Sequence, residues 1–248
     1  MKKLFLCALL MISNCFAGEI LLTKENTAIL RGPVNSSSVS DVMNQLSELN
    51  KKGKSSDPIF LILYTPGGSV MDGLNLIQYM NSLDRPIHSV AIFAASMGFH
   101  ILENSNKRMV TKYGTIMSHR ANGGFQGDIP QQVKSRFKHV VDLLDKMDEQ
   151  VISRTSGKFN KKSYSELIRD EYWAVGSNAL NDGFVDEVVS LKCDSSLDGV
   201  TTKNIMTLFG PVSAAFSNCP LITEPVGLSP EQEINVKKTL TTILNLEV

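Results

Sequence analysis

The sequence has no net charge, because its 25 lysine and arginine residues are matched by 25 aspartate and glutamate residues. A chain with this balance lacks a strongly basic surface for nucleic acid or an anionic membrane, so we expect neither as the main partner. It also has no internal repeat and no low-complexity tract. What remains is ordinary for a globular protein: 42% hydrophobic and 20% charged residues in a chain of 248, enough for one domain and an appendage.

Long apolar runs are absent after the first 12 residues, so no later segment has the length to cross a membrane. At the N-terminus, two lysines precede an apolar run at 4–12 that is too short to span a bilayer, and Ala17 offers a small residue for cleavage. This pattern is typical of a signal peptide, so we expect an exported protein, periplasmic or secreted, that begins near Gly18. The alternatives are a buried first helix or strand, and a lipoprotein acylated at Cys15, which lacks the usual small residue before it.

Cysteine is scarce, with four residues in the whole chain. Cys7 and Cys15 lie in the expected signal peptide, which leaves Cys193 and Cys219. Two cysteines in an oxidising compartment more often pair than stay free, so we expect a disulfide between them. The bridge would close a loop of about 25 residues and stabilise the fold by about 3 kcal/mol on the loop-entropy model. Two unpaired buried thiols are the alternative.

Apolar segments with the pattern of strands alternate along the chain with segments that have the pattern of helices, which predicts an α/β fold. The predicted strands cover residues 20–30, 59–64, 87–93, 109–111 and 115–118. The predicted helices cover residues 39–49, 70–77, 98–103 and a long pattern at 133–151. The strands at 59–64 and 87–93 have the composition of strands buried on both faces. Strands that alternate with helices favour a parallel sheet with crossover helices.

The chain changes character after Leu191, where Ser, Thr, Gly and Pro are scattered between the two remaining cysteines. It ends in a capping box at 229–232 with proline at the first helical position, which predicts a helix to about Leu246. We therefore expect a signal peptide at 1–17, a main domain at 18–190, and a disulfide-tied C-terminal extension at 191–248 that ends in a helix.

Two of the buried strands end in residues suited to catalysis. One leads into Pro66, Gly67 and Gly68, and the next leads to Ser96, which precedes Met97. The carboxyl ends of parallel strands share one crevice, where ligands bind. A serine at a strand-to-helix turn is a frequent position for a nucleophile, and the backbone amides of Gly68 and Met97 are candidates for an oxyanion hole. The plainer alternatives are an ordinary turn at the glycines and a helix cap at Ser96.

Few histidines are available as the base that a serine nucleophile needs. The chain has four: His88, His100, His119 and His139. His88 lies inside a predicted strand, His139 on the long helical pattern, and His100 among apolar residues that favour packing. His119 ends a short strand just before a glycine-rich loop, a position that can face the crevice. On this geometry His119 is the leading candidate.

Four motifs together resemble the proteolytic subunit of Clp proteases. In chain order they are Pro66-Gly67-Gly68, Ala95-Ser96-Met97-Gly98, Met117-Ser118-His119 and the glycine-rich loop at 123–127. The resemblance covers residues 20–189, about two thirds of the chain, and implies a crotonase-like fold, a parallel sheet flanked by helices, with serine peptidase activity through a Ser-His-Asp triad. It implies Ser96 as the nucleophile, His119 as the base, and the amides of Gly68 and Met97 as the oxyanion hole.

The third member of the triad departs from the family pattern. Counting back without a gap from Gly183 places Glu171 where the family has aspartate, and Asp170 stands one residue earlier. Either carboxylate can orient a histidine and stabilise its imidazolium. Register favours Glu171, and Asp170 is the alternative. A third reading, in which both acids are solvated at a helix end, also stays open.

The resemblance also bears on partners. Clp proteolytic subunits form two stacked seven-membered rings fed by ATP-driven unfoldases, and residues 129–157 correspond to the element through which the rings meet. The charges on this segment, Asp145 and Asp148 among them, fit a solvated helix face. An exported protein would meet neither ATP nor a cytoplasmic unfoldase. We therefore expect a homo-oligomer that acts on peptide or unfolded protein without an unfoldase, and we expect no cofactor or metal.

Two functions of other kinds stay open. One is a binding or scaffolding protein of the cell envelope that has kept the fold and lost turnover. The other is an enzyme of the same fold that acts on acyl thioesters. The second is disfavoured because such sites rely on oxyanion amides and acids and need no Ser-His pair.

Overall fold

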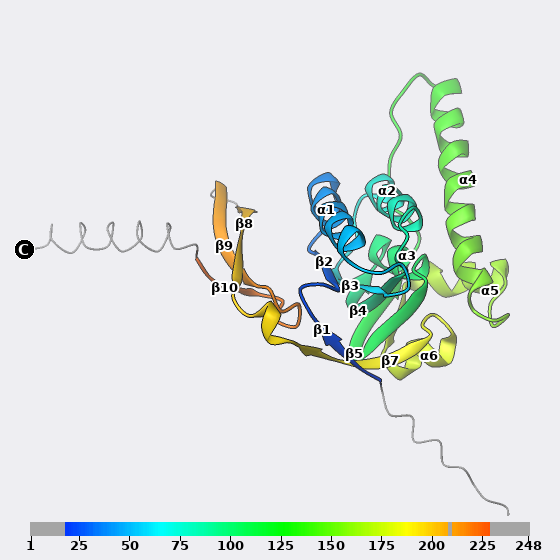
Figure 1. The fold of residues 1–248 in the computed structure, drawn as a ribbon. Helices are drawn as coiled ribbons and strands as arrows, with labels where there is room; N and C mark the ends of the chain where they lie inside the picture. Colours follow the sequence, from blue (N-terminus) through cyan, green and yellow to red (C-terminus); the bar gives the residue numbers. More distant parts are fainter. Residues whose placement is uncertain (1–17, 208–209, 229–248) are drawn as a thin grey trace, which may run out of the picture.

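A mainly parallel sheet forms the centre of the molecule. The computed structural model describes residues 18–207 and 210–228. Its seven-stranded sheet has the order β1-β7-β5-β4-β3-β2, and β6 pairs with β5 off this path (Figure 1). The strands are β1 (Gly18–Leu22), β2 (Thr27–Arg31), β3 (Ile59–Thr65), β4 (Ile87–Ala95), β5 (Lys107–Ser118), β6 (Tyr172–Val175) and β7 (Glu187–Cys193). Only the β5–β6 pairing in this sheet is antiparallel, which confirms the predicted α/β fold with a parallel sheet.

Helices bury the larger of two apolar clusters against the sheet. They are α1 (Ser36–Lys52), α2 (Val70–Asn81), α3 (Met97–Glu103), α4 (Gln131–Ser153), α5 (Lys161–Leu167) and α6 (Ser177–Asp182). Because side chains alternate along a strand, Leu61 and Leu63 of β3 join the cluster that includes Leu46 of α1, while Ile62 joins a second cluster with Val90. The strand at 59–64 is therefore buried on both faces, as its composition predicts.

Two predicted strand boundaries are wrong. The segment 20–30 forms two strands, because the polar residues from Thr23 to Asn26 make a turn in which the Thr23 amide donates to Asn26 Oδ1 at 2.8 Å. β1 then pairs with β7 and β2 with β3, at opposite edges of the sheet. The strands predicted at 109–111 and 115–118 form one strand, β5, whose pairing with β4 shifts register in between. A β-bulge at this point accommodates the residues that the sequence pattern indicates as a break between two strands.

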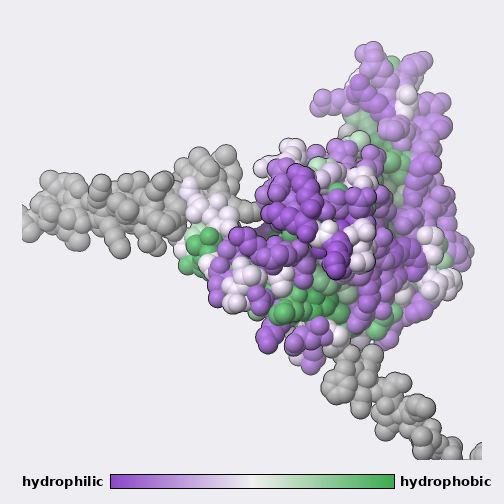
Figure 2. All heavy atoms as spheres, in the orientation of Figure 1, coloured by the Kyte–Doolittle hydropathy of each residue, from purple (hydrophilic) through white to green (hydrophobic). Residues whose placement is uncertain are grey.

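Helix α4 extends well beyond the sheet and the other helices (Figure 1). Its buried residues, Met147 and Val151, both lie in its C-terminal half, where it packs on the body of the molecule. Toward the N-terminal end of the helix, Phe137 is 56% exposed. Figure 2 shows hydrophobic residues along the side of α4 that faces the rest of the molecule, and hydrophilic residues on its outer side. The prediction of a helix with one apolar face at 133–151 is confirmed, and the helix runs from Gln131 to Ser153.

The residues after β7 form a small antiparallel sheet that the sequence did not predict. Its strands are β8 (Val200–Thr207), β9 (Gly210–Ser217) and β10 (Pro225–Leu228), in the order β10-β9-β8. The predicted disulfide is present and joins Cys193, at the end of β7, to Cys219, just after β9. Arg31 of β2 also holds the extension, because its Nη2 donates to the carbonyl of Ile222 at 3.0 Å and its guanidinium lies over the ring of Phe216.

Two predictions concern residues outside those that the structure describes: the signal peptide at 1–17 and the terminal helix from Ser229 to about Leu246. Within the described part of the chain, no helix has both the length and the apolar character needed to cross a bilayer.

Candidate active site

Ser96 occupies a strained turn between β4 and α3. Its backbone has φ 54° and ψ −119°, a conformation that residues other than glycine rarely adopt and that costs about 1–3 kcal/mol. The turn is held because the Ser96 amide donates to the carbonyl of Met117 at 2.9 Å and the Ser96 carbonyl accepts from Phe99. The Ser96 hydroxyl does not cap α3. The helix-cap alternative is therefore wrong, and the strain holds a hydroxyl that is free for another role.

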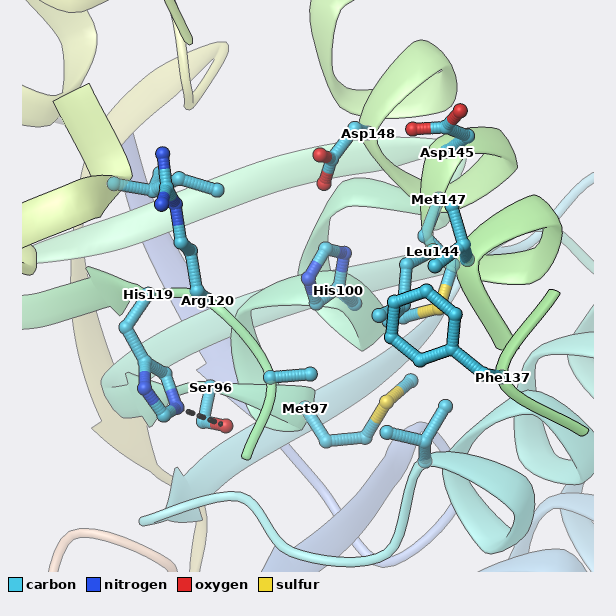
Figure 3. Close-up of a pocket in the computed structure, with 14 residues that line it drawn as sticks. Ser96, Met97, His100, His119, Arg120, Phe137, Leu144, Asp145, Met147 and Asp148 are labelled. Carbon is cyan, nitrogen blue, oxygen red and sulfur yellow. Dashed lines mark hydrogen bonds between the residues drawn. The ribbon is translucent and has the colours of Figure 1, made fainter. Parts of the chain in front are cut away.

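His119 lies beside Ser96, with 2.8 Å between its Nε2 and Ser96 Oγ. The sheet explains this meeting, because β4 and β5 run parallel with Ala95 opposite Met117, so the residues that follow each strand emerge together. Next to His119, the buried Ser118 hydroxyl contacts the Tyr164 hydroxyl at 2.9 Å, which anchors the end of β5 against α5. Figure 3 shows the Ser96 and His119 side chains pointing toward each other.

In the described part of the chain, no other histidine side chain forms a hydrogen bond to the Ser96 hydroxyl. Burial, with a smaller contribution from His119, lowers the pKa of His100 to about 4, and its Nδ1 is buried with no hydrogen-bond partner in the described part of the chain. Burial and then Lys107 lower the pKa of His88, which lies within β4 against Phe60. His139 is exposed on α4. Within the described residues, Ser96 and His119 are the serine and histidine brought together at these strand ends.

The glycine pair after β3 packs directly against Ser96. Gly67 has φ 88° and Gly68 has φ 148°, both in the region that favours glycine. A Cβ at Gly67 would lie 2.6 Å from Ser96 Cβ and 2.7 Å from the Met97 nitrogen, so only glycine lets the two turns approach this closely. Val34 fixes the pair from the other side, because its amide donates to the Gly67 carbonyl at 2.8 Å. Among residues 18–207 and 210–228, no hydrogen bond engages the amide of Gly68 or that of Met97.

The two candidate acids have hydrogen-bond partners other than His119. Glu171 has φ 65°, and its Oε2 accepts from Trp173 Nε1 at 3.0 Å. Asp170 forms an ion pair with Arg169 at 2.7 Å, and its side chain is 74% exposed. In the described residues, the His119 ring has one hydrogen bond, the one to Ser96. The geometry thus unites the serine and the histidine and leaves both acids engaged elsewhere.

A pocket of about 670 Å³ opens beside the Ser96–His119 pair (Figure 3). Apolar residues of several elements line one side: Val70, Met97, Phe137, Val141, Leu144, Met147 and Ile168. Asp145 and Asp148 of α4, together with His100 and Arg120, supply its polar groups. The expectation that the charges of α4 form a solvated face is wrong for Asp148, because that residue is half-buried on the pocket wall. Helical periodicity places the two acids three residues apart on one side of α4, but only the packing of α4 turns that side toward Ser96.

The fold and this site define an α/β protein with a serine and a histidine paired at the carboxyl ends of parallel strands. The sequence model of the Clp protease family matches residues 16–192. The ATP-dependent Clp protease proteolytic subunit of Streptococcus pyogenes serotype M5 (strain Manfredo) is 30% identical over 172 residues, which is 68% of this chain and 86% of the relative. The same subunit of Streptococcus gordonii (strain Challis) is 30% identical over 172 residues, 68% of this chain and 87% of that protein. The chain belongs to the Clp protease family, a family of serine peptidases.

Proposed function

We propose that this protein hydrolyses peptide bonds, with Ser96 as the nucleophile and His119 as the general base. The observation that carries the proposal is the 2.8 Å contact between His119 Nε2 and the hydroxyl of a serine held at positive φ. A base within hydrogen-bond reach activates a hydroxyl that is otherwise a weak nucleophile. The strained turn presents the hydroxyl at the mouth of the pocket, as in other hydrolases with a nucleophile between a strand and a helix.

The reaction follows from these positions. His119 takes the Ser96 proton as Oγ attacks the peptide carbonyl carbon, and the carbonyl oxygen gains the negative charge. The unengaged amides of Gly68 and Met97 donate to that oxygen. His119 then gives the proton to the leaving amine, and an acyl-enzyme remains on Ser96. Water, deprotonated by His119, attacks the acyl carbon and releases the second product with Ser96 restored.

We assign the acid of the triad to Glu171, with Asp170 as the alternative. In the antiparallel pairing of β5 and β6, Ser118 lies opposite Tyr172, so the same register extended by one residue sets Glu171 across from His119. Its side chain would have to leave Trp173 and turn to the imidazole. Asp170 lies one residue farther along and is turned outward to Arg169.

Export and assembly belong to the same proposal. The apolar N-terminal segment and the disulfide between the two cysteines that follow it both fit a protein of an oxidising compartment, periplasmic or secreted. The relatives are named as ATP-dependent proteolytic subunits. For this chain we propose a homo-oligomer that degrades peptides or unfolded protein without an ATP-dependent unfoldase and without a metal or other cofactor.

A fluorophosphonate probe tests the nucleophile directly. We expect the purified protein to be labelled at Ser96, with labelling lost in Ser96→Ala and in His119→Ala. The matched controls are Ser190→Ala, an exposed serine of β7, and His139→Ala, an exposed histidine of α4, and both should label like the parent.

The outcome also decides the rival function. His119 lacks an acid partner among the described residues, which is what a binding protein without turnover would show. An unlabelled Ser96 in a folded protein, together with Glu171→Gln and Asp170→Asn variants that behave like the parent in every assay, would favour that scaffold.

A further inference from the structure

The pocket beside Ser96 has a polar end as well as apolar walls. Figure 3 shows Ser96 at one side of the pocket, the His100 ring in the middle, and the Asp145 and Asp148 carboxylates beyond it. Phe137 and Leu144 of α4 form a wall between these two ends. A side chain that enters next to Ser96 therefore passes along apolar surface before it reaches the acids.

Of these two acids, Asp148 is the one that has no hydrogen bond or close ion pair among the residues that the structure describes. The Asp145 carboxylate forms an ion pair with Lys161 of α5 at 2.9 Å. Nη2 of the nearby Arg120 donates to the backbone carbonyl and the hydroxyl of Ser165 in α5, each at 3.2 Å. Within the described part of the chain, no group donates a hydrogen bond to Asp148, although it is half-buried.

The surroundings of Asp148 disfavour its negative charge. Burial, with a smaller contribution from Asp145, raises the pKa of this carboxyl to about 6, and the cations of Lys161 and Arg120 offset only part of the effect. A half-buried carboxylate without a hydrogen-bond donor is costly unless a cation arrives to pair with it. The pocket therefore offers an acceptor to an incoming positive charge, at the end farthest from the nucleophile.

We propose that this pocket binds a lysine or arginine side chain of the substrate, at the residue whose carbonyl Ser96 attacks. The aliphatic stem of that side chain lies along Phe137 and Leu144, and its cation pairs with Asp148. Lysine and arginine are suited to such a site because they pack their methylene groups on apolar surface and keep the charge at the tip. Asp148 is thus a specificity-determining residue, and the proposal rests on the peptidase function proposed above.

Turnover of matched substrates tests the proposal. Peptide aminocoumarins would differ only at the residue before the scissile bond, with lysine, arginine or norleucine, which has a similar unbranched stem without the ammonium. We expect kcat/KM for the lysine and arginine peptides to exceed that for norleucine by about 10-fold or more, the scale of a charge-assisted hydrogen bond. Equal values, or a preference for norleucine, would overturn the proposal.

Variants of α4 assign the preference to one carboxylate. Asp148→Asn keeps the shape, and we expect it to lower kcat/KM for the lysine peptide about 10-fold while norleucine turnover stays within about 2-fold. Asp148→Glu should keep part of the lysine preference. The control is Asp142→Asn, an exposed acid of the same helix that pairs with Lys138 outside the pocket, and it should change neither substrate. A lysine preference that survives Asp148→Asn would refute the role of Asp148.

A binding measurement separates this proposal from the proposed catalysis. Fluorophosphonate labelling reports whether Ser96 is an active nucleophile, whatever the pocket prefers. Fluorescence anisotropy with Ser96→Ala then compares peptides whose C-terminal residue is lysine or norleucine, with no need for turnover. Tighter binding of the lysine peptide that is lost in Ser96→Ala/Asp148→Asn supports the pocket assignment even if labelling fails. Equal binding of the two peptides refutes it even if labelling succeeds.

Discussion

Removing the Cys193–Cys219 disulfide should lower the free energy of unfolding by about the amount that the bridge contributes through chain entropy. The two cysteines are 26 residues apart, and loop closure of that length is worth about 3.5 kcal/mol at 25 °C on the chain-entropy model. The closed loop lies within the extension, but Cys193 ends β7 of the central sheet, so the prediction treats the extension and that sheet as one cooperative unfolding unit. We therefore expect Cys193→Ala/Cys219→Ala to lose about 3.5 kcal/mol of unfolding free energy, and alanine at both positions leaves no lone thiol.

The single tryptophan provides the assay. Trp173 lies in β6 and is 51% exposed, so its fluorescence reports the unfolding of the main sheet in urea. With a urea dependence of about 2 kcal/mol per molar, the midpoint should fall by somewhat under 2 M. Ser96 labelling should be unchanged, because Ser96 follows β4, which β5 separates from β7 in the sheet. A loss below about 1 kcal/mol, or a loss of labelling, would refute the reasoning.

Three further predictions concern the site. Gly67→Ala should destabilise the protein by about 1–3 kcal/mol in thermal unfolding, because φ 88° and the 2.6 Å approach to Ser96 Cβ exclude a side chain; Gly123→Ala, with open space around its Cβ, is the control. Ser96→Gly should raise stability by about 1 kcal/mol while abolishing labelling, since glycine adopts φ 54° without strain, and a less stable variant would contradict this. Burial raises the pKa of Asp148 from 3.8 to about 6, so the folded protein loses stability as the pH rises through this window. Asp148→Asn lacks that loss, so its stability advantage should grow from about pH 4 to pH 6 and then stay constant, and parallel pH profiles would contradict the assignment.

The positions of Ser96 and His119 in the fold could be predicted, because they depend on the local sequence pattern of the strands that precede them. Two buried strands of suitable length precede Ser96 and His119, and neighbouring parallel strands present their carboxyl ends together. The structure brings these two residues together as the strand pattern predicts. The turn at Gly67 and Gly68 could also be predicted, because glycine is the residue suited to the positive φ angles that both positions adopt.

The rest depends on contacts between distant segments. Helical periodicity marks Asp148 as one charge among several on α4, and only the packing of that helix turns it toward the pocket. Glu171 is placed by register alone, but its side chain is directed by Trp173 two residues later. The strands β8, β9 and β10 carry Ser, Thr, Gly and Pro in place of a clear apolar alternation, so no periodic signal predicts them.

The disulfide also changes what a single cut in the chain can do. The loop that it closes includes the exposed residues 198–200, between the short 3-10 helix η2 (Ser195–Leu197) and the start of β8. Cleavage there gives two fragments that Cys193 and Cys219 still join, while Arg31 keeps its hydrogen bond to Ile222 on the far fragment. On a denaturing gel without reductant, a nicked molecule therefore migrates as one species. The fragment from β8 onward stays covalently attached to β7 of the central sheet until the disulfide is reduced.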